Sequence, residues 1–485
     1  MEITASRLLA PHFGTSILVW SNIIAVVLLC LAFGYYMGGR LADRKPNLEV
    51  LSMLSLISGM YFLFVPKLTS WLVNFGNTAI YESNPGNIGF FLTTFLVSFF
   101  LFGIPLIFLG MTSPLMVKIY NLSINRVGES TGIVFAVSTL GSILGTIIPT
   151  FWLLPQVGTT TSIFIMGGIL LAIGLMFASI KKFVAIVVVL IAATLVNALP
   201  EPTLAYQVIH QRESPYHHIK VVEDKDSNRY MVFNEGLSLE SVYKRDGSIL
   251  TGGFYDYFNF LPLMISPESD KKVLIVGLAG ATMPRQLNYF FGDQVEVDAV
   301  EIDEETVEVA NEYFDLSNLK LNVFIDDGRS FLNQNEKKYD VIMVDVFQNE
   351  LYIPWTFTTR EFWELVSDRL NEQGIVAINV HASSNKNKLL ELMANTQAAV
   401  FENVYLTDFL AGRGSSYMIT ASKQPLDFNL NQSLPWELAE IKQGLSHTKK
   451  IVYDSSKKVF TDDWAPIEQL TEHSVTTYRK QKLLK

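Results

Sequence analysis

The pattern of apolar and polar residues divides the chain near residue 200. Before that point long apolar runs follow one another, and each is near or above the roughly 18–20 residues that cross a bilayer. Backbone polar groups cannot stay unpaired in lipid, so these runs should be helical. We therefore expect a transmembrane domain of about six helices over residues 1–200. The predicted spans are Phe13–Gly39, Val50–Pro66, Ile88–Val117, two within Thr131–Ile180 that separate near Pro155–Thr160, and Phe183–Pro200.

Basic residues lie between these runs and predict the topology. The positive-inside rule assigns Arg40–Lys45, Lys118–Arg126 and Lys181–Lys182 to the cytoplasm. Six spans then leave residue 201 onward outside, whereas a weak last span lying in the interface would place it inside. The sequence thus predicts an integral protein of a bacterial or archaeal cell membrane, with the side of the second half left open. Gly141 and Gly145 form a G-x-x-x-G step that favours close helix packing.

The second half begins with a pattern of short strands. His217–Val222 and Tyr230–Phe233 alternate apolar and polar residues around the polar turn Glu223–Asn228, which is typical of a hairpin. Thr251–Leu263 is predicted to be a helix. We therefore expect a small N-terminal β-hairpin subdomain and linker helix over residues 201–265, followed by a Rossmann-like domain over residues 266–485.

From Lys272 the pattern is strand–helix repeated, which indicates an α/β domain with a mostly parallel sheet. The last two predicted strands follow each other closely, so one antiparallel edge strand is expected. The predicted strands are Val273–Val276, Val297–Ile302, Leu321–Ile325, Val341–Val344, Ile375–Val380, Asn403–Thr407 and Ser416–Ala421. The predicted helices are Met283–Tyr289, Glu304–Phe314, Gly328–Asn333, Thr359–Leu370 and Asn387–Val400.

The stretch Lys272–Asp303 has the residue order of a nucleoside-binding unit. A buried strand leads into the small-residue turn Gly277–Thr282, and a second strand ends on an acid. Small residues let the backbone approach a ligand, and the acid accepts hydrogen bonds from ribose hydroxyls. In such sheets the ligand lies over the carboxyl ends of the strands. The acids expected there are Glu301, Asp303, Asp326, Asp327 and Asp345.

Composition excludes several classes of function. The net charge of −10 falls mainly in the second half and gives no basic stripe for nucleic acid. The single cysteine, Cys30, lies in an apolar run and cannot form an intrachain disulfide. His217 and His218 are adjacent, so in a strand they face opposite sides and cannot chelate together. No His or Cys spacing indicates a metal site.

Five motifs of the second half resemble the spermidine synthase family, which has the S-adenosylmethionine-dependent methyltransferase fold. They are ESPYHHIKVV, KKVLIVGLAGA, VEID, IDDGRSFL and YDVIMVDVF. The resemblance extends to the membrane-fused branch, in which transmembrane helices precede this domain, through SRLLAPHFGTS, GYYMGGRLADR, STLGSILGT, DVFQNELYIPWTFTTREFWELVSDRL and FTDDWAPIE. Such relatives carry one more apolar span before Ser6, which leaves open whether a span is missing here.

The resemblance implies roles for particular residues. Glu301 would bind the ribose hydroxyls, Asp327 the adenine amino group, and Asp345 would orient or deprotonate the attacking amine. An amine must lose a proton before it attacks a sulfonium-activated carbon, so a base is needed there. The implied cofactor-binding residues are His217, Gly277, Gly280, Glu301, Asp327 and Gly328.

The chain departs from the family pattern mainly where a diamine would bind. The G-G-G-D-G-G turn reads G-L-A-G-A-T, with Gly280 at the position of the acid. The second acid of D-S-S-D is Gln348, and the Y-H-E motif reads Tyr255-Asp256-Tyr257. Asp256, Glu235 and Tyr352 are the remaining candidates for substrate binding, with Tyr352–Trp355 as a lid over the substrate.

Three functions remain open. The first is a membrane-bound aminopropyltransferase that uses decarboxylated S-adenosylmethionine. The second is a methyltransferase that uses S-adenosylmethionine on a membrane-associated substrate; a cation near Gly277–Thr282, with Arg285 as local candidate, would favour it. The third is a non-catalytic transporter-like or polyamine- or nucleoside-binding membrane protein. Expected partners are the lipid bilayer, a small-molecule amine or a membrane-associated acceptor, and a second copy in a homodimer, with no nucleic acid and no metal.

Overall fold

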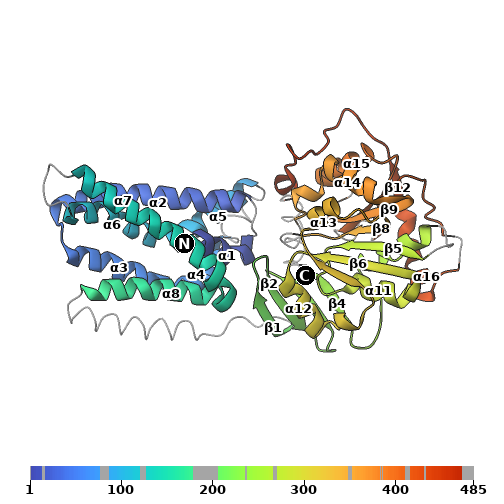
Figure 1. Cartoon of the computed structure of the whole chain (residues 1–485), viewed down its shortest axis with the longest axis horizontal. Helices are drawn as coiled ribbons and strands as arrows, with labels where there is room; N and C mark the ends of the chain where they lie inside the picture. Colours follow the sequence, from blue (N-terminus) through green and yellow to red (C-terminus); the bar gives the residue numbers. More distant parts are fainter. Residues whose placement is uncertain are drawn as a thin grey trace. The chain divides into compact units, whose positions relative to one another are not determined.

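The chain forms two compact units, Met1–Thr203 and Leu204–Lys485, in the computed structural model. The first unit consists of helices, and the second contains both strands and helices (Figure 1). The structure describes residues 2–13, 17–76, 87–120, 127–177, 206–234, 238–265, 270–347, 352–382, 384, 386–409, 416–430 and 433–471.

The first unit is helical. Its helices are α1 (Glu2–Phe13), α2 (Ile17–Arg44), α3 (Leu48–Phe62), α4 (Val65–Gly76), α5 (Asn87–Ser98), α6 (Ile104–Tyr120), α7 (Val127–Ile148) and α8 (Leu154–Met176). Two π-helical turns, η2 (Phe99–Gly103) and η4 (Pro149–Leu153), continue α5 into α6 and α7 into α8. The chain reverses by a kink at Gly158, where φ is +76°, inside the break predicted near Pro155–Thr160.

Four helical segments among the described residues are long and apolar enough to cross a membrane. They are Ile17–Arg44, Ile88–Tyr120, Val127–Leu153 and Gln156–Met176. Helices α3 and α4 pass the same test together but bend by 63°, which gives up to five spans in the described part of the chain. The sixth predicted span, Phe183–Pro200, lies outside the described residues.

Glycines determine the closest helix contact of this unit. A Cβ on Gly34 would lie 2.5 Å from the carbonyl oxygen of Ile107, and one on Gly38 would lie 2.6 Å from Cα of Met111. Helices α2 and α6 therefore approach to a distance that a side chain at either position would prevent. Gly141 and Gly145 have no heavy atom within 4 Å of an added Cβ, so this G-x-x-x-G step makes no close packing contact with described residues.

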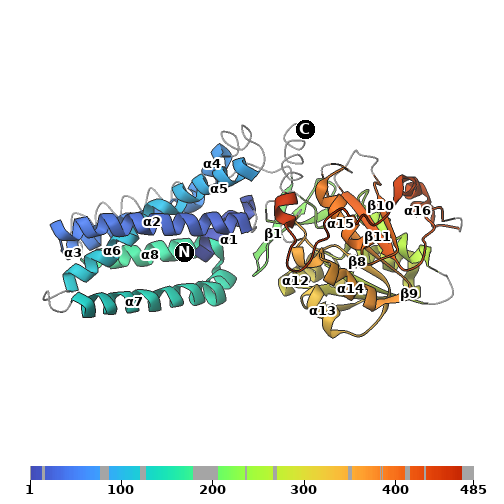
Figure 2. The same cartoon turned by 90° about the horizontal axis from the view of Figure 1, so that it is seen from above.

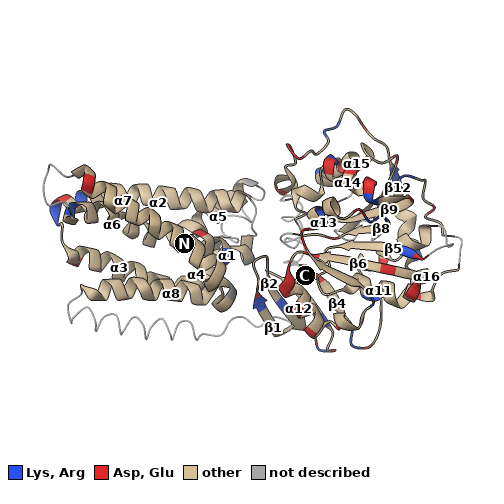
Figure 3. Cartoon of the chain, in the orientation of Figure 1, with Lys and Arg blue, Asp and Glu red and all other residues tan. Residues whose placement is uncertain are grey.

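Charged residues of the first unit gather at one end of its helices, as Figure 3 shows. Lys118 Nζ lies 3.0 Å from Asp43 Oδ1, which joins the end of α6 to the end of α2. The stretches containing Arg40–Lys45 and Lys118 therefore share one end, as the positive-inside assignment requires.

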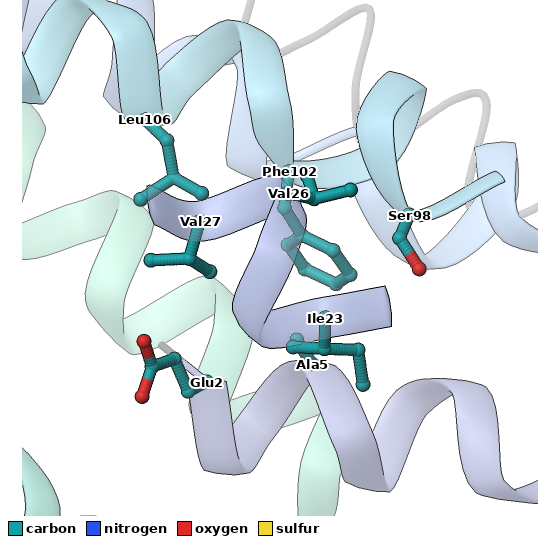
Figure 4. A pocket seen from close by; sticks show the side chains of 8 residues that line it. All are labelled: Glu2, Ala5, Ile23, Val26, Val27, Ser98, Phe102 and Leu106. Atoms are coloured by element: carbon teal, nitrogen blue, oxygen red, sulfur yellow. The ribbon is translucent and has the colours of Figure 1, made fainter. Parts of the chain in front are cut away.

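A cavity of about 10 Å³ lies among α1, α2, α5, η2 and α6 (Figure 4). This volume is near the minimum that holds one water molecule. It is lined by Glu2, Ala5, Ile23, Val26, Val27, Ser98, Phe102 and Leu106.

The second unit contains two sheets. The smaller one is antiparallel in the order β1 (Gln207–Glu213), β2 (His218–Glu223), β3 (Arg229–Phe233) and β4 (Ser241–Tyr243). Strands β2 and β3 pair from Ile219 opposite Phe233 to Glu223 opposite Arg229, which is the hairpin expected from the alternating pattern. The predicted helix over Thr251–Leu263 is much shorter, because α10 covers only Tyr255–Phe258 and a 3₁₀ turn follows at Leu261–Met264.

The larger sheet has eight strands in the order β12-β10-β11-β9-β8-β5-β6-β7. Their bounds are β5 (Lys271–Val276), β6 (Val295–Glu301), β7 (Asn322–Ile325), β8 (Tyr339–Val344), β9 (Leu370–His381), β10 (Asn403–Thr407), β11 (Ser416–Ser422) and β12 (Thr448–Ile451). Strands β5 to β9 are parallel. The prediction of one antiparallel edge strand is wrong in its position: antiparallel β11 lies between β9 and β10, and β12 forms the edge.

Helices cover both faces of this sheet (Figures 1 and 2). One core packs Val273, Ile275 and Met343 against α11 (Thr282–Phe291) and α12 (Glu304–Tyr313). The other packs Leu274 and Val344 against the remaining helices. These are α13 (Gly328–Gln334), α14 (Arg360–Arg369) and α15 (Lys388–Ala398); α16 (Trp436–Ile441) follows near the chain's end. Successive strand residues alternate between the two cores because side chains in a strand point to opposite faces.

Candidate functional site

The site lies where the strand order reverses, at the carboxyl ends of β5 and β8. From β5 the chain moves outward through β6 and β7 and then returns to place β8 on the other side of β5. The N–H of Asp345, just after β8, donates to the carbonyl oxygen of Val276 at 2.9 Å. A Cβ on Gly277 would lie 2.2 Å from the carbonyl oxygen of Asp345, so only glycine fits here. The sheet thus brings Gly277 and Asp345 together at its topological switch point.

The turn after β5 has an unusual backbone. Gly277 has φ of +94°, and the non-glycine residues Ala279 and Ala281 have φ of +46° and +66°. L-residues rarely adopt positive φ, and such conformations persist only where surrounding contacts hold them. The Gly280 N–H donates to Ser241 Oγ at 2.8 Å, and a Cβ on Gly280 would lie 2.7 Å from Ser241 Cβ. Gly280 therefore packs against β4, and its expected role in cofactor binding stays a prediction.

Glu301 ends β6 beside this turn. Its Oε2 accepts from the N–H groups of Leu278 at 3.1 Å and Ala279 at 3.0 Å, and its Oε1 accepts from Asp303 N–H at 3.2 Å. Burial raises the pKa of this carboxyl group, and the three backbone bonds act against that rise. Glu301 therefore holds the turn as well as lying where a ribose-binding acid is expected. A carboxylate can accept about four hydrogen bonds, so the three bonds leave acceptor capacity.

The E-S-P-Y-H segment contacts the same strand end through Ser214. Ser214 Oγ donates to Asp303 Oδ2 at 2.6 Å and accepts from the His217 N–H at 2.8 Å. The His217 ring is buried and stacks on Phe233, with ring centroids 4.2 Å apart and planes 3° from parallel. The structure thus brings His217 near the end of β6 through Ser214, a residue that was not predicted from the sequence.

Asp327 and Gly328 begin α13. Asp327 Oδ1 accepts from the Ser330 N–H at 2.9 Å, which is a helix N-cap. A Cβ on Gly328 would lie 2.3 Å from Val276 Cγ1, so glycine allows α13 to start close to β5. Asp327 therefore has a structural role, and its second oxygen remains a candidate for adenine.

Asp345 follows β8 and lies beside Asn379 of β9. Burial raises its pKa to about 7, while a hydrogen bond from Asn379 Nδ2 to Oδ1 at 3.1 Å opposes the rise. Asn379 is buried on β9, and its own Oδ1 has no hydrogen-bond partner among the described residues. A carboxyl group with a pKa near 7 can exchange a proton at neutral pH, as a general base must.

Tyr255 lies close to this acid. It is buried, and its hydroxyl donates to the carbonyl oxygen of Leu239 at 2.8 Å. Burial raises its pKa well above the usual value, and the charges of Asp345 and Glu240 act in the same direction. Tyr255 therefore stays neutral and forms an uncharged side of the site next to Asp345.

Asp256 was expected to bind substrate, and the structure gives it another role. It is buried, and its carboxylate accepts from the N–H groups of Thr251 at 2.9 Å and Gly252 at 2.8 Å, from Thr251 Oγ1, and from Gln286 Nε2 at 2.6 Å. These bonds use its acceptor capacity to hold the loop before α10. Tyr352 is also buried, at 9% exposure. Glu235 and Gln348 lie outside the described residues.

Asn379 and His381 were not predicted from the sequence. Both lie at the carboxyl end of β9, two residues apart, and so share the sheet face on which Asp345 is found. A signal was present, since AINVH places two polar residues at the end of an apolar strand. Within the described ranges, no group of three His, Cys, Asp or Glu side chains could hold a metal ion. The sheet order and the acids at its carboxyl edge define a Rossmann-like domain of the methyltransferase type.

Comparisons with known proteins find a known domain and several relatives. Residues 258–426 match the family model described as the spermine/spermidine synthase domain. A probable polyamine aminopropyl transferase of Bifidobacterium longum is 29% identical over 331 residues, covering 62% of this chain and 71% of that protein. Polyamine aminopropyltransferase 2 of Aquifex aeolicus is 20% identical over 453 residues, covering 88% of this chain and 85% of the relative.

Among solved structures, a probable spermidine synthase from Corynebacterium glutamicum aligns with a TM-score of 0.43 and 20% identity, covering 54% of this chain and 98% of that one. Residues 258–426 thus contain a spermine/spermidine synthase domain, as the motifs indicated. The relatives named above are aminopropyltransferases, which are transferases.

Proposed function

We propose that the chain is a membrane-bound aminopropyltransferase, which transfers the aminopropyl group of decarboxylated S-adenosylmethionine to an amine. The observation that carries this proposal is the pairing of Gly277 and Asp345 at the switch point, with Glu301 beside the same turn. A turn of mostly small residues suits an adenosyl group, and a strand-end acid suits its ribose. The family adds that relatives with this domain are aminopropyltransferases.

The acceptor amine is the nucleophile in this reaction. Asp345 takes a proton from the ammonium group, and the freed nitrogen lone pair attacks the carbon next to the sulfonium. The new C–N bond forms as the C–S bond breaks, and the bonding electrons pass to sulfur, leaving neutral methylthioadenosine. Asp345 suits this task because its pKa of about 7 lets it accept a proton near neutral pH.

Asn379 would position the same nitrogen. Its Nδ2 already donates to Asp345, so its carbonyl oxygen is the group left to accept an N–H of the amine. An unpaired buried carbonyl oxygen costs about 1–3 kcal/mol, so a bound amine that satisfies it gains affinity. The Asp345 carboxylate and the Asn379 amide oxygen would then each accept an N–H of the amine. Together they would direct the nitrogen lone pair at the carbon next to the sulfonium.

Arg285 favours the decarboxylated donor over S-adenosylmethionine itself. Intact S-adenosylmethionine carries a carboxylate, which needs a cation near the turn. The Arg285 guanidinium donates instead to the carbonyl oxygen of Phe314 and lies 4.6 Å from the centre of the Tyr243 ring. These two contacts engage the guanidinium, and burial lowers its pKa. Methyl transfer to a membrane-associated acceptor is the second candidate, because Gly280 and Gln348 replace two acids of the diamine site.

The membrane part of the proposal rests on the apolar helices. Four described segments are long and apolar enough to span a bilayer, and charges gather at one end of them. We propose that they anchor the enzyme in a prokaryotic cell membrane.

Calorimetry of the full chain in lipid nanodiscs tests the donor. Decarboxylated S-adenosylmethionine, S-adenosylmethionine and methylthioadenosine would be titrated separately, into wild type and Glu301→Gln. We expect the decarboxylated donor and methylthioadenosine to bind, and Glu301→Gln to weaken both at least tenfold. Binding of none of the three would contradict both transfer reactions. Clear preference for the intact donor would favour methyl transfer.

A further inference from the structure

Three aromatic rings lie together beside Asp345. The His381 ring centre is 5.1 Å from that of Phe347 and 6.1 Å from that of Phe254, in a tilted and an edge-on arrangement. Phe254 and Phe347 are only partly buried, so both keep surface that a ligand can contact. We name Phe254, Phe347 and His381 the three-ring cluster.

Independent contacts connect this cluster to the reacting end of the site. Phe347 follows Asp345 by two residues, and His381 follows Asn379 by two residues on the same strand face. Asn379 is itself bonded to Asp345. The Phe254 ring centre lies 3.9 Å from that of Tyr255. Burial and then the charge of Asp345 raise the pKa of the Tyr255 hydroxyl. An amine held by Asp345 and Asn379 would therefore have aromatic surface next to its carbon chain.

A diamine requires a second carboxylate near the three-ring cluster, in addition to Asp345. A second ammonium group must replace its lost hydration with a carboxylate, since an unpaired buried charge is costly. Asp256, the expected second acid, is fully engaged by Thr251, Gly252 and Gln286. Glu240 is the other described carboxylate whose charge, after burial and together with Asp345, raises the pKa of Tyr255. Burial raises the pKa of Asp345, and the hydrogen bond from Asn379 opposes that rise.

We propose that the acceptor is an amine with one amino group on a hydrocarbon or aryl chain, and that the chain lies against the three-ring cluster. This inference rests on the proposed function, because it names the acceptor of that reaction. Apolar carbon atoms gain from leaving water against partly buried rings, whereas a terminal ammonium would lose hydration there. Hydrocarbon amines of this kind also partition into a bilayer, which gives the apolar helices a reason to be joined to the enzyme.

An isosteric pair of amines tests the proposal. 1-Aminopentane and 1,4-diaminobutane have the same number of heavy atoms and differ in a terminal methyl or ammonium group. Full-length protein in nanodiscs would be assayed with decarboxylated S-adenosylmethionine, by methylthioadenosine release and by the mass of the alkylated amine. We expect kcat/KM for 1-aminopentane to exceed that for 1,4-diaminobutane at least tenfold, and 2-phenylethylamine to be accepted.

Phe347→Asp should reverse this selectivity. A carboxylate in the three-ring cluster supplies the missing partner for a second ammonium, so the ratio of the two kcat/KM values should fall at least tenfold. Tyr453→Asp is the matched control, since Tyr453 is an aromatic residue of 46% exposure after β12 and far along the sheet from β8. It should leave the ratio unchanged.

The possible outcomes separate this inference from the proposed function. Preference of the wild type for 1,4-diaminobutane would overturn the acceptor inference alone, and loss of that preference in Glu240→Gln would identify Glu240 as the second carboxylate. An unchanged ratio in Phe347→Asp would equally contradict a role for the cluster. Donor binding without product from any amine would overturn the proposed aminopropyl transfer itself.

Discussion

Asn379 donates through Nδ2 to Oδ1 of Asp345 at 3.1 Å, and its own carbonyl oxygen has no hydrogen-bond partner among the described residues. The two side chains come from neighbouring parallel strands, β9 and the end of β8. One acid that can exchange a proton and one amide oxygen that can accept an N–H therefore stand side by side. Under the proposed function, this pair would activate the amine although the chain lacks several acids of the family pattern.

Substitution of Asp345 by asparagine should separate chemistry from donor binding. The variant keeps the shape of the side chain but cannot take the proton of the amine, and general base catalysis typically contributes about 10²–10⁴-fold. We expect kcat to fall by at least about 10²-fold, with methylthioadenosine affinity within a factor of three of wild type. Rapid-quench kinetics and calorimetry would measure both. Unchanged turnover would remove Asp345 from the mechanism.

The same variant should be more stable than the wild type at high pH. The folded-state pKa of Asp345 is raised to about 7, so the folded protein binds this proton more tightly than the unfolded chain. Its contribution to stability is full below the unfolded pKa near 4 and is lost as pH rises through about 7. We expect Asp345→Asn to raise Tm at pH 8 and to have a smaller effect at pH 5. Scanning calorimetry at the two values checks this, and a larger gain at pH 5 would contradict the sign.

Asn379→Leu should shift the pH dependence of the reaction. The hydrogen bond from Asn379 stabilises the charged form of Asp345 and so lowers its pKa; its loss should raise that pKa. The rising limb of kcat/KM, set by deprotonation of Asp345, should then move to higher pH than in wild type. Asn379→Gln, which retains an amide, should shift the limb less. A purely structural role would lower the activity of both variants without moving the limb.

Gly277→Ala should destabilise the domain more than Gly292→Ala. Both glycines have positive φ, +94° and +53°, so both variants carry backbone strain of about 1–3 kcal/mol. A Cβ on Gly277 would also lie 2.2 Å from the carbonyl oxygen of Asp345, whereas one on Gly292 has nothing within 4 Å. Urea unfolding of the two variants measures the difference. Equal loss of stability in the two variants would mean that the close approach of Gly277 to Asp345 is not required for the stability of the domain.

Asp256→Ala should affect stability and leave acceptor recognition intact. It removes the acceptor for the N–H groups of Thr251 and Gly252 and for Gln286, and each buried donor left without a partner costs about 1–3 kcal/mol. We expect a loss of about 2–4 kcal/mol in unfolding free energy, with little change in KM for the amine. Asp463→Ala, at an exposed acid, is the control. A raised KM with normal stability would restore the substrate-binding role.

The sequence was sufficient for the features that depend on strand ends. Parallel strands bring their carboxyl ends to one edge, so Gly277, Glu301 and Asp345 could be grouped from the strand pattern alone. The parallel direction of the central strands β5 to β9 followed from the repeated strand–helix pattern, whereas their order in the sheet was not predicted. Hydrogen-bond partners that depend on side-chain geometry could not be predicted from the strand pattern. The bond of Asn379 to Asp345 depends on which strands are neighbours, and Asp256, a candidate at a departure from the family's Y-H-E motif, bonds to its own loop.

Two features of the fold could not be predicted from the sequence, for a similar reason. The closeness of the last two predicted strands correctly indicated antiparallel pairing, but only the pairing of β11 with β9 shows that β11 is inside the sheet. Strand β12 is short, and three of its four residues are polar, so it shows no apolar–polar alternation. The helix expected over Thr251–Leu263 is interrupted because Gly252 has φ of +79° and Asp256 binds the preceding backbone.

The central claim is that Asp345 activates an amine for attack on decarboxylated S-adenosylmethionine. The most direct measurement is mass spectrometry of a single turnover, with the full chain in nanodiscs, the decarboxylated donor and 1-aminopentane or 1,4-diaminobutane. We predict that wild type forms one aminopropylated amine for each methylthioadenosine released, and that Asp345→Asn binds the donor but forms neither product on the same timescale. A methylated product from intact S-adenosylmethionine, or equal turnover by Asp345→Asn, would contradict the claim.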